Sequence, residues 1–115
     1  MQKLIAIILL LISQVALAEL KVKDYDQLPE NQKAMFNDYI NGAGIGISWV
    51  GIKEIGRIKN YKPLYCPPPN LALTTENYVQ ILKARIQKIK RTPAYEISSI
   101  EPELIEGLID TFPCK

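Results

Sequence analysis

The most reactive side chains in this chain are two cysteines, and both lie beside proline. Cys66 precedes Pro67, and Cys114 follows Pro113. A thiolate can act as a nucleophile or a metal ligand, but both roles are commonly shared with histidine, and the sequence has none. Serine triads and zinc sites are therefore excluded, and the expected chemistry of the two thiols is oxidation to a disulfide.

Carboxylates are the other side chains that could perform catalysis. Glu103 lies three residues before Glu106 and seven before Asp110, so a helix would present them on one side. Paired carboxylates can hydrolyse glycosidic bonds. Acidic residues on an exposed helix side far more often keep a protein soluble, so we predict no enzyme activity, no metal and no cofactor.

Three glycines fall close together, at Gly42, Gly44 and Gly46. A phosphate-binding loop needs a preceding strand and the spacing Gly-x-Gly-x-x-Gly, whereas position 47 is isoleucine and the upstream pattern is helical. The better interpretation is that Gly42 and Gly46, one helical turn apart, let another helix or a partner approach the backbone closely. Each glycine weakens a helix by about 1 kcal/mol, so the sequence leaves open whether this helix is continuous or is kinked or broken near Gly42 to Gly46.

The beginning of the chain is typical of an export signal. Lys3 supplies the positive start, Leu4–Ile12 is an apolar run, and Ala16–Ala18 is a small-x-small cleavage site. The run is shorter than the roughly 20 residues that span a bilayer. We therefore predict that residues 1–18 are a signal peptide, that the protein reaches a bacterial periplasm, and that it has no membrane attachment after cleavage.

Export places both cysteines in an oxidising compartment. A Cys66–Cys114 disulfide is then the default expectation. It would close a loop of about 48 residues and stabilise the fold by about 4 kcal/mol.

Charge gives little indication of a partner. The net charge of +2 does not favour nucleic acid. A basic stretch nevertheless precedes an acidic one, and the two either suit helix dipoles and solvated faces, which we favour, or form a charged docking edge. The basic residues are Lys83, Arg85, Lys88, Lys90 and Arg91, and the acidic ones are Glu96, Glu101, Glu103, Glu106 and Asp110.

Hydrophobic spacing predicts helices and no strands. Residues 19–28 are polar and aperiodic, which predicts a flexible N-terminal arm, and residues 29–115 form the helical domain. The fold class is all-α: a small bundle of three to four helices with one disulfide. The expected core stripes are Phe36, Ile40, Ala43, Ile47 and Val50; then Tyr78, Val79, Leu82, Ile86 and Ile89; then Ile100, Leu104, Leu108 and Phe112.

The middle of the first helix should be apolar nearly all round, because Ile45, Trp49, Ile52 and Gly56 form a second line on it. We therefore expect it to be buried between neighbouring elements.

The ends of the later helices carry recognisable signals. Thr74 or Thr75 can cap the second long helix, and Ser98 with Glu101 is a candidate capping box for the last. Prolines 63, 67, 68 and 69 predict a stiff, extended connection before the second helix. We expect Tyr61, Tyr65 and Tyr95 to be displayed in connections, and Tyr39 and Tyr78 to lie at the core.

Several of these signals together resemble the Rap/Tai family of immunity proteins. They are Cys66-Pro67, Leu73-Thr74-Thr75 opening a helix, Thr92-Pro93 closing it, Phe112-Pro113-Cys114, and Tyr39-Ile40-Asn41-Gly42 in the first helix. In that family, an exported, all-helical, disulfide-linked domain neutralises a peptidoglycan amidase delivered by a type VI secretion system. The resemblance implies the same role and partner here.

The expected function is therefore inhibition by occlusion of the toxin's cleft. We place the partner-binding residues, by their expected exposure, at Arg91, Thr92, Tyr95 and Glu96, where the alternative is a plain helix linker. The alternative function is a periplasmic structural or chaperone-like helical module with no toxin partner. The sequence leaves a homodimer open.

Overall fold

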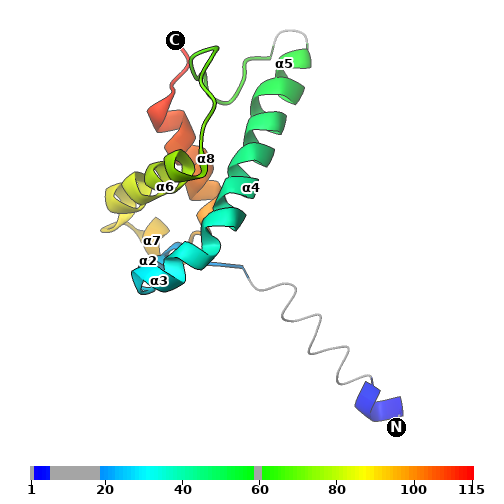
Figure 1. The fold of residues 1–115 in the computed structure, drawn as a ribbon, viewed down its shortest axis with the longest axis vertical. Helices are drawn as coiled ribbons and strands as arrows, with labels where there is room; N and C mark the ends of the chain where they lie inside the picture. The colour runs from blue at the N-terminus through cyan, green and yellow to red at the C-terminus, as the bar shows by residue number, and fades with distance from the viewer. Residues whose placement is uncertain (1, 6–18, 59–60) are drawn as a thin grey trace.

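The computed structural model describes residues 2–5, 19–58 and 61–115, and these are largely helical, as predicted (Figure 1). The predicted signal peptide, residues 1–18, lies outside the described residues except for 2–5, and so does its cleavage site. Residues 19–58 and 61–115 contain seven α-helices, more than the three or four expected. The elements are α2 Val22–Asp26, α3 Glu30–Lys33, η1 Ala34–Phe36, α4 Asn37–Ser48, η2 Trp49–Glu54, α5 Ile55–Arg57, α6 Thr75–Ile89, α7 Pro93–Ile97 and α8 Ile100–Thr111.

The elements α3 to α5 form one continuous rod. The residues at its internal junctions, including Lys33, Ser48 and Glu54, all have right-handed helical backbone angles. The sequence left open a break near the glycines, and the structure shows none there: α4 runs from Asn37 to Ser48 through all three. The irregular turns lie instead at η1, which is a 3₁₀ turn, and at η2, which is a π-helix.

Only one of the three clustered glycines is required by packing within the chain. A Cβ at Gly44 would lie 2.4 Å from the ring of Tyr78 on α6, so the absent side chain lets these helices meet. A Cβ at Gly42 or Gly46 would meet no atom of the described residues within 4 Å. We expected another helix to approach the backbone at Gly42 and Gly46. Within the chain, the helix α6 approaches α4 at Gly44 instead.

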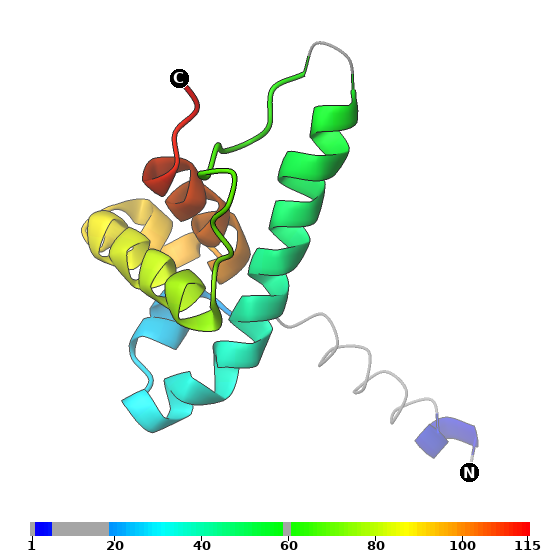
Figure 2. The ribbon, with the colours of Figure 1, turned by 45° about the horizontal axis from the view of Figure 1, so that its top comes forward.

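The expectation that the middle of the long helix is buried between neighbouring elements is wrong. Ile40 is buried as predicted, but Ile45, Trp49 and Val50 are 54%, 52% and 56% exposed. Figure 2 shows the reason: the rod extends past the packed body, so its outer half contacts neighbours on one side only.

The helices α6 and α8 confirm the predicted stripes. Every predicted core residue of α6 is buried, and so are Ile100, Leu104 and Leu108 of α8, while Phe112 is partly buried. Thr74 caps α6 in a capping box whose second member is Asn77. The box expected at Ser98 and Glu101 does not form, because the helix begins one residue later.

The segment predicted to be a flexible arm is instead packed into the fold. Val22 and Tyr25 of α2 are 0% and 1% exposed. The backbone N–H of Val22 donates to the carbonyl oxygen of Ser98 at 2.9 Å, and Ile100 N–H donates to Leu20 at 3.1 Å. Sequence aperiodicity missed this segment because one helical turn is too short to show a period.

A short stretch before α6, Leu64–Cys66, connects the rod to the end of α8, and we call it the tether. Leu64 N–H donates to Gly51 of η2 at 2.9 Å, and Cys66 N–H donates to Phe112 at 2.8 Å. Between them Tyr65 is fully buried, and its hydroxyl hydrogen-bonds with Ser48 Oγ.

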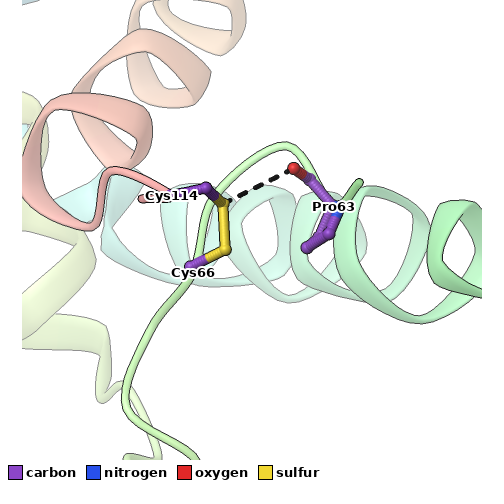
Figure 3. Close-up of a disulfide and its surroundings, with 3 residues drawn as sticks. All are labelled: Pro63, Cys66 and Cys114. Atoms are coloured by element: carbon purple, nitrogen blue, oxygen red, sulfur yellow. Dashed lines mark hydrogen bonds between the residues drawn. A yellow bond between two sulfur atoms is a disulfide. The ribbon is translucent and has the colours of Figure 1, made fainter. Parts of the chain in front are cut away.

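The predicted disulfide closes the tether. Cys66 and Cys114 are bonded, with their Cα atoms 5.0 Å apart, within the range that a disulfide requires. Figure 3 shows the bridge beside Pro63, whose carbonyl oxygen lies 3.7 Å from the Cys114 sulfur. A disulfide sulfur has no hydrogen to donate, so this is a contact only.

Replacing both cysteines, in Cys66→Ser/Cys114→Ser, should lower the free energy of unfolding by about 4 kcal/mol, because the unfolded chain regains the entropy of a 48-residue loop. Urea unfolding monitored by circular dichroism measures this. Wild-type protein treated with reductant is the control and should match the variant, whereas an unchanged midpoint would contradict the prediction.

Substituting Gly44→Ala should destabilise the fold by about 2 kcal/mol, since the new methyl group would overlap the Tyr78 ring. Gly46→Ala is the matched control on the same helix. It should raise stability by up to about 1 kcal/mol, because alanine is the better helix former and nothing opposes its Cβ. Equal effects of the two substitutions, in unfolding curves of dilute protein, would contradict the packing described.

Candidate partner-binding surfaces

The predicted partner-binding residues lie at the connection between α6 and α8, which contains the short helix α7. Pro93 occupies its first turn, where proline is favoured, and Thr92 precedes it with extended backbone angles. Thr92 also fastens the end of α6: its N–H and its Oγ1 both donate to the carbonyl oxygen of Ile89 at 2.8 Å. The connection is therefore an ordered corner.

Tyr95 is an anchor of this corner and is not displayed. It is 8% exposed, and its hydroxyl donates to Asp26 Oδ2 on α2 at 2.7 Å. This hydrogen bond raises the pKa of Tyr95 to about 12. The prediction that Tyr95 is exposed for a partner is wrong, because α2 covers it.

Of the other four tyrosines for which we made predictions, two lie where expected and two do not. Tyr61 is displayed as predicted, at 67% exposed, and Tyr78 lies in the core. Tyr65 was expected on display and is fully buried in the tether, whereas Tyr39 was expected at the core and is 48% exposed, with its hydroxyl donating to Glu101 on α8.

The remaining predicted residues do face solvent. Arg91, Thr92 and Glu96 are exposed, and Glu96 pairs with Lys23 of α2 at 2.9 Å. Beside them Ile97 is 70% exposed, and the sequence reasoning missed it. We call Arg91, Thr92, Glu96 and Ile97 the α7 corner.

Two residues of the basic stretch, Arg85 and Lys88, pair with two of the acidic stretch, Glu103 and Asp110. Arg85 Nε donates to Glu103 at 2.9 Å, and these side chains are only 16% and 7% exposed. Arg85 Nη1 and Lys88 Nζ both approach Asp110, at 3.0 and 2.9 Å. The pairs clamp α6 against α8, and two of the three candidate catalytic carboxylates, Glu103 and Asp110, serve this clamp.

A second exposed surface lies on the outer side of the rod. It carries Gly42, Ile45 and Gly46 on α4 and Trp49 at the start of η2, with Asp38 and Lys53 as exposed charges at its two ends. We call these six residues the α4 face. Lys53 Nζ lies 4.4 Å from the centre of the Trp49 ring, a cation–π contact that keeps both side chains on this face.

Neither surface has the features of a metal centre or a membrane span. In the described ranges, no group of three or more acidic, histidine or cysteine side chains could hold a metal ion. No helix there is long and apolar enough to cross a bilayer. Both surfaces consist of side chains suited to contact with another macromolecule.

Tyr95→Phe should lower the free energy of unfolding by about 1 kcal/mol at pH 8, because Asp26 loses its hydrogen-bond donor. The folded pKa lies above the ordinary value of 10.0, so the contribution of the hydroxyl is complete below pH 10 and lost as the pH rises toward 12. Urea unfolding at pH 8 and at pH 11.5 should therefore show a smaller difference between variant and wild type at the higher pH.

Tyr61→Phe is the control for this experiment, since that side chain is exposed, and it should change stability little at either pH. A Tyr95→Phe difference that is absent at pH 8, or that does not shrink at alkaline pH, would contradict the anchor described.

Comparison with known proteins does not identify a family for this chain. No protein-family model, no curated protein and no solved structure matched it. The family resemblance seen in the sequence therefore stays a prediction, and function has to be argued from the two surfaces.

Proposed function

We propose that this protein is a periplasmic immunity protein that binds a type VI secretion peptidoglycan amidase and occludes its catalytic cleft. The observation that carries the proposal is the α7 corner, which is exposed yet fixed by three contacts with α2. Such a corner can enter a cleft without losing much conformational entropy, which favours tight binding. Occlusion requires no catalytic group of the inhibitor.

The fixation of the corner comes from residues far away in the chain. Tyr95 is held by Asp26, Ser98 accepts a hydrogen bond from Val22, and Glu96 pairs with Lys23. All three contacts are made by α2. The corner is thus supported by the segment immediately after the proposed export signal.

The corner's composition suits a protein partner. Ile97, at 70% exposed, offers an apolar anchor, and Arg91 and Glu96 offer charges of both signs around it. Interfaces typically combine such a central apolar contact with a polar rim. Ile97 takes the place that the sequence reasoning gave to Tyr95.

The residues that suggested the family also have structural roles, which supports the proposal. Thr74 caps α6, Thr92 precedes α7, and Cys114 closes the disulfide with Cys66. Thr92 lies in the corner itself, whereas Thr74 and the disulfide lie at the start of α6 and beyond the end of α8.

Export belongs to the same proposal. Cleavage after Ala18 would make Glu19 the first residue of the mature protein, and its side chain accepts a hydrogen bond from Ser99 Oγ at 2.7 Å. This bond lowers the pKa of Glu19. The mature chain would then begin on the surface of the fold and lead directly into α2.

The alternative, a structural or chaperone-like helical module, is favoured by one observation, the exposed apolar residues of the α4 face. It differs in requiring no toxin partner. A neighbouring gene for a cysteine–histidine amidase would favour the immunity role.

Mixing the oxidised protein with the amidase encoded beside its gene should give a complex with one inhibitor chain per toxin and abolish cell-wall hydrolysis. Ile97→Asp should weaken binding by about tenfold or more, since it places a charge at the apolar anchor. Isothermal calorimetry and a peptidoglycan-release assay measure the two effects.

Ile58→Asp is the matched control: Ile58 is 54% exposed, after the end of α5, and its substitution should leave inhibition unchanged. Absence of binding by the oxidised wild-type protein would contradict the immunity role. Normal binding by Ile97→Asp would contradict the α7 corner as the inhibitory site.

A further inference from the structure

We propose that the far end of the rod binds reversibly to the surface of a membrane that contains anionic phospholipid. The residues concerned lie at and just after the end of α5, and we call them the rod tip: Arg57, Ile58, Tyr61 and Lys62. The proposal does not depend on inhibition of a toxin, because the rod tip and the α7 corner share no residue. Figures 1 and 2 both place the end of α5 well apart from α7.

A backbone hydrogen bond joins the two uncharged residues of the rod tip. Ile58 has extended backbone angles, which end α5, and its carbonyl oxygen accepts a hydrogen bond from the N–H of Tyr61 at 3.1 Å. This bond holds Ile58 and Tyr61 next to each other at the end of the rod.

Both of these side chains suit the edge of a membrane. Ile58 and Tyr61 are more than half exposed. An aliphatic side chain gains free energy when it enters the acyl region of a bilayer. Tyrosine is favoured at the level of the headgroups, because its ring is apolar and its hydroxyl is polar. The rod tip can therefore insert an apolar side chain without any rearrangement of the core.

Basic residues flank the two side chains in the sequence. Arg57 and Lys62 are exposed, and Lys53 lies one helical turn before Arg57. Across residues 49–58 and 61–64 the one acidic residue is Glu54, which lies 3.7 Å from Arg57. The end of the rod is therefore locally positive, and its charge is complementary to an anionic bilayer.

This composition favours a membrane over a protein as the partner. Lysine is depleted at protein interfaces, whereas a short apolar insertion combined with basic residues is typical of peripheral membrane binding. The proposed export would place the rod tip beside the bacterial inner membrane, which contains anionic phosphatidylglycerol.

Such a contact differs from the prediction of no membrane attachment. That prediction considered spanning segments and the net charge of the whole chain, and peripheral binding depends on neither. We expect binding to be weak, and we expect salt to weaken it further because high ionic strength screens exposed charges.

Co-sedimentation with lipid vesicles tests the proposal, using oxidised protein recovered from the periplasm. Wild type should bind vesicles of phosphatidylglycerol and phosphatidylcholine at low salt, and about 1 M salt should release it. Arg57→Glu and Lys62→Glu should each weaken this binding by at least about fivefold. Arg91→Glu makes the same change of charge at an exposed residue outside the rod tip, so it is the matched control and should bind normally.

Two further variants test the apolar insertion. Ile58→Ser keeps the charge but removes the apolar side chain, so it should weaken binding to the same vesicles by about tenfold. In Tyr61→Trp/Trp49→Phe, the one tryptophan lies at the rod tip. Its fluorescence emission should shift to shorter wavelength with vesicles that contain phosphatidylglycerol and stay unchanged with pure phosphatidylcholine.

Wild-type protein that does not bind the anionic vesicles at low salt would overturn the proposal, and so would equal binding to pure phosphatidylcholine. An equal loss of binding in Arg91→Glu and Arg57→Glu would reject the rod tip as the site. If wild type ignores vesicles and Ile58→Ser abolishes binding of the amidase, the rod tip belongs to the toxin and the membrane contact is wrong. Vesicle binding by a protein that binds no amidase would support the membrane contact and reject the immunity role alone.

Discussion

The Cys66–Cys114 disulfide, together with the tether that leads into it, is the constraint on which the rest of this structure depends. The tether bonds to Gly51 on the rod and to Phe112 at the end of α8, and Tyr65 fills the space between. A rod that extends beyond its body could otherwise swing about its one packed half. The covalent link fixes its outer half to the opposite end of the chain.

This constraint explains how so small a chain can expose apolar residues. The inner half of the rod packs on α6 through Ile40 and Gly44, while the outer half is held by the tether and leaves Ile45 and Trp49 in solvent. The α7 corner is fixed at the other end by α2. Two separate surfaces therefore result, and the α7 corner is the one that we assign to a toxin.

Much of the fold could be predicted from the sequence because its signals are local. The 3.6-residue stripes of α6 and α8, the cap at Thr74 and the disulfide were all predicted and are confirmed. The clearest errors concern contacts between distant residues. Tyr95 is buried by Asp26, which is 69 positions away, and the packing of α2 depends on Ser98 in the same way.

The candidate site was predictable only in part for the same reason. Its place at the α6–α8 connection followed from the helix pattern, but which side chains face solvent depends on α2, which the sequence did not reveal. The glycines show the limit most clearly. Gly42, Gly44 and Gly46 look alike in sequence, and only the position of Tyr78 shows that Gly44 is required inside the fold.

The central claim is that an exported chain is closed by one disulfide between the tether and the end of α8. Intact mass spectrometry of protein recovered from the periplasm of cells that make the full-length chain tests it most directly. We predict a chain that begins at Glu19 and lacks the two hydrogens of Cys66 and Cys114. A full-length chain, or one that alkylation shows to carry two free thiols, would contradict the account.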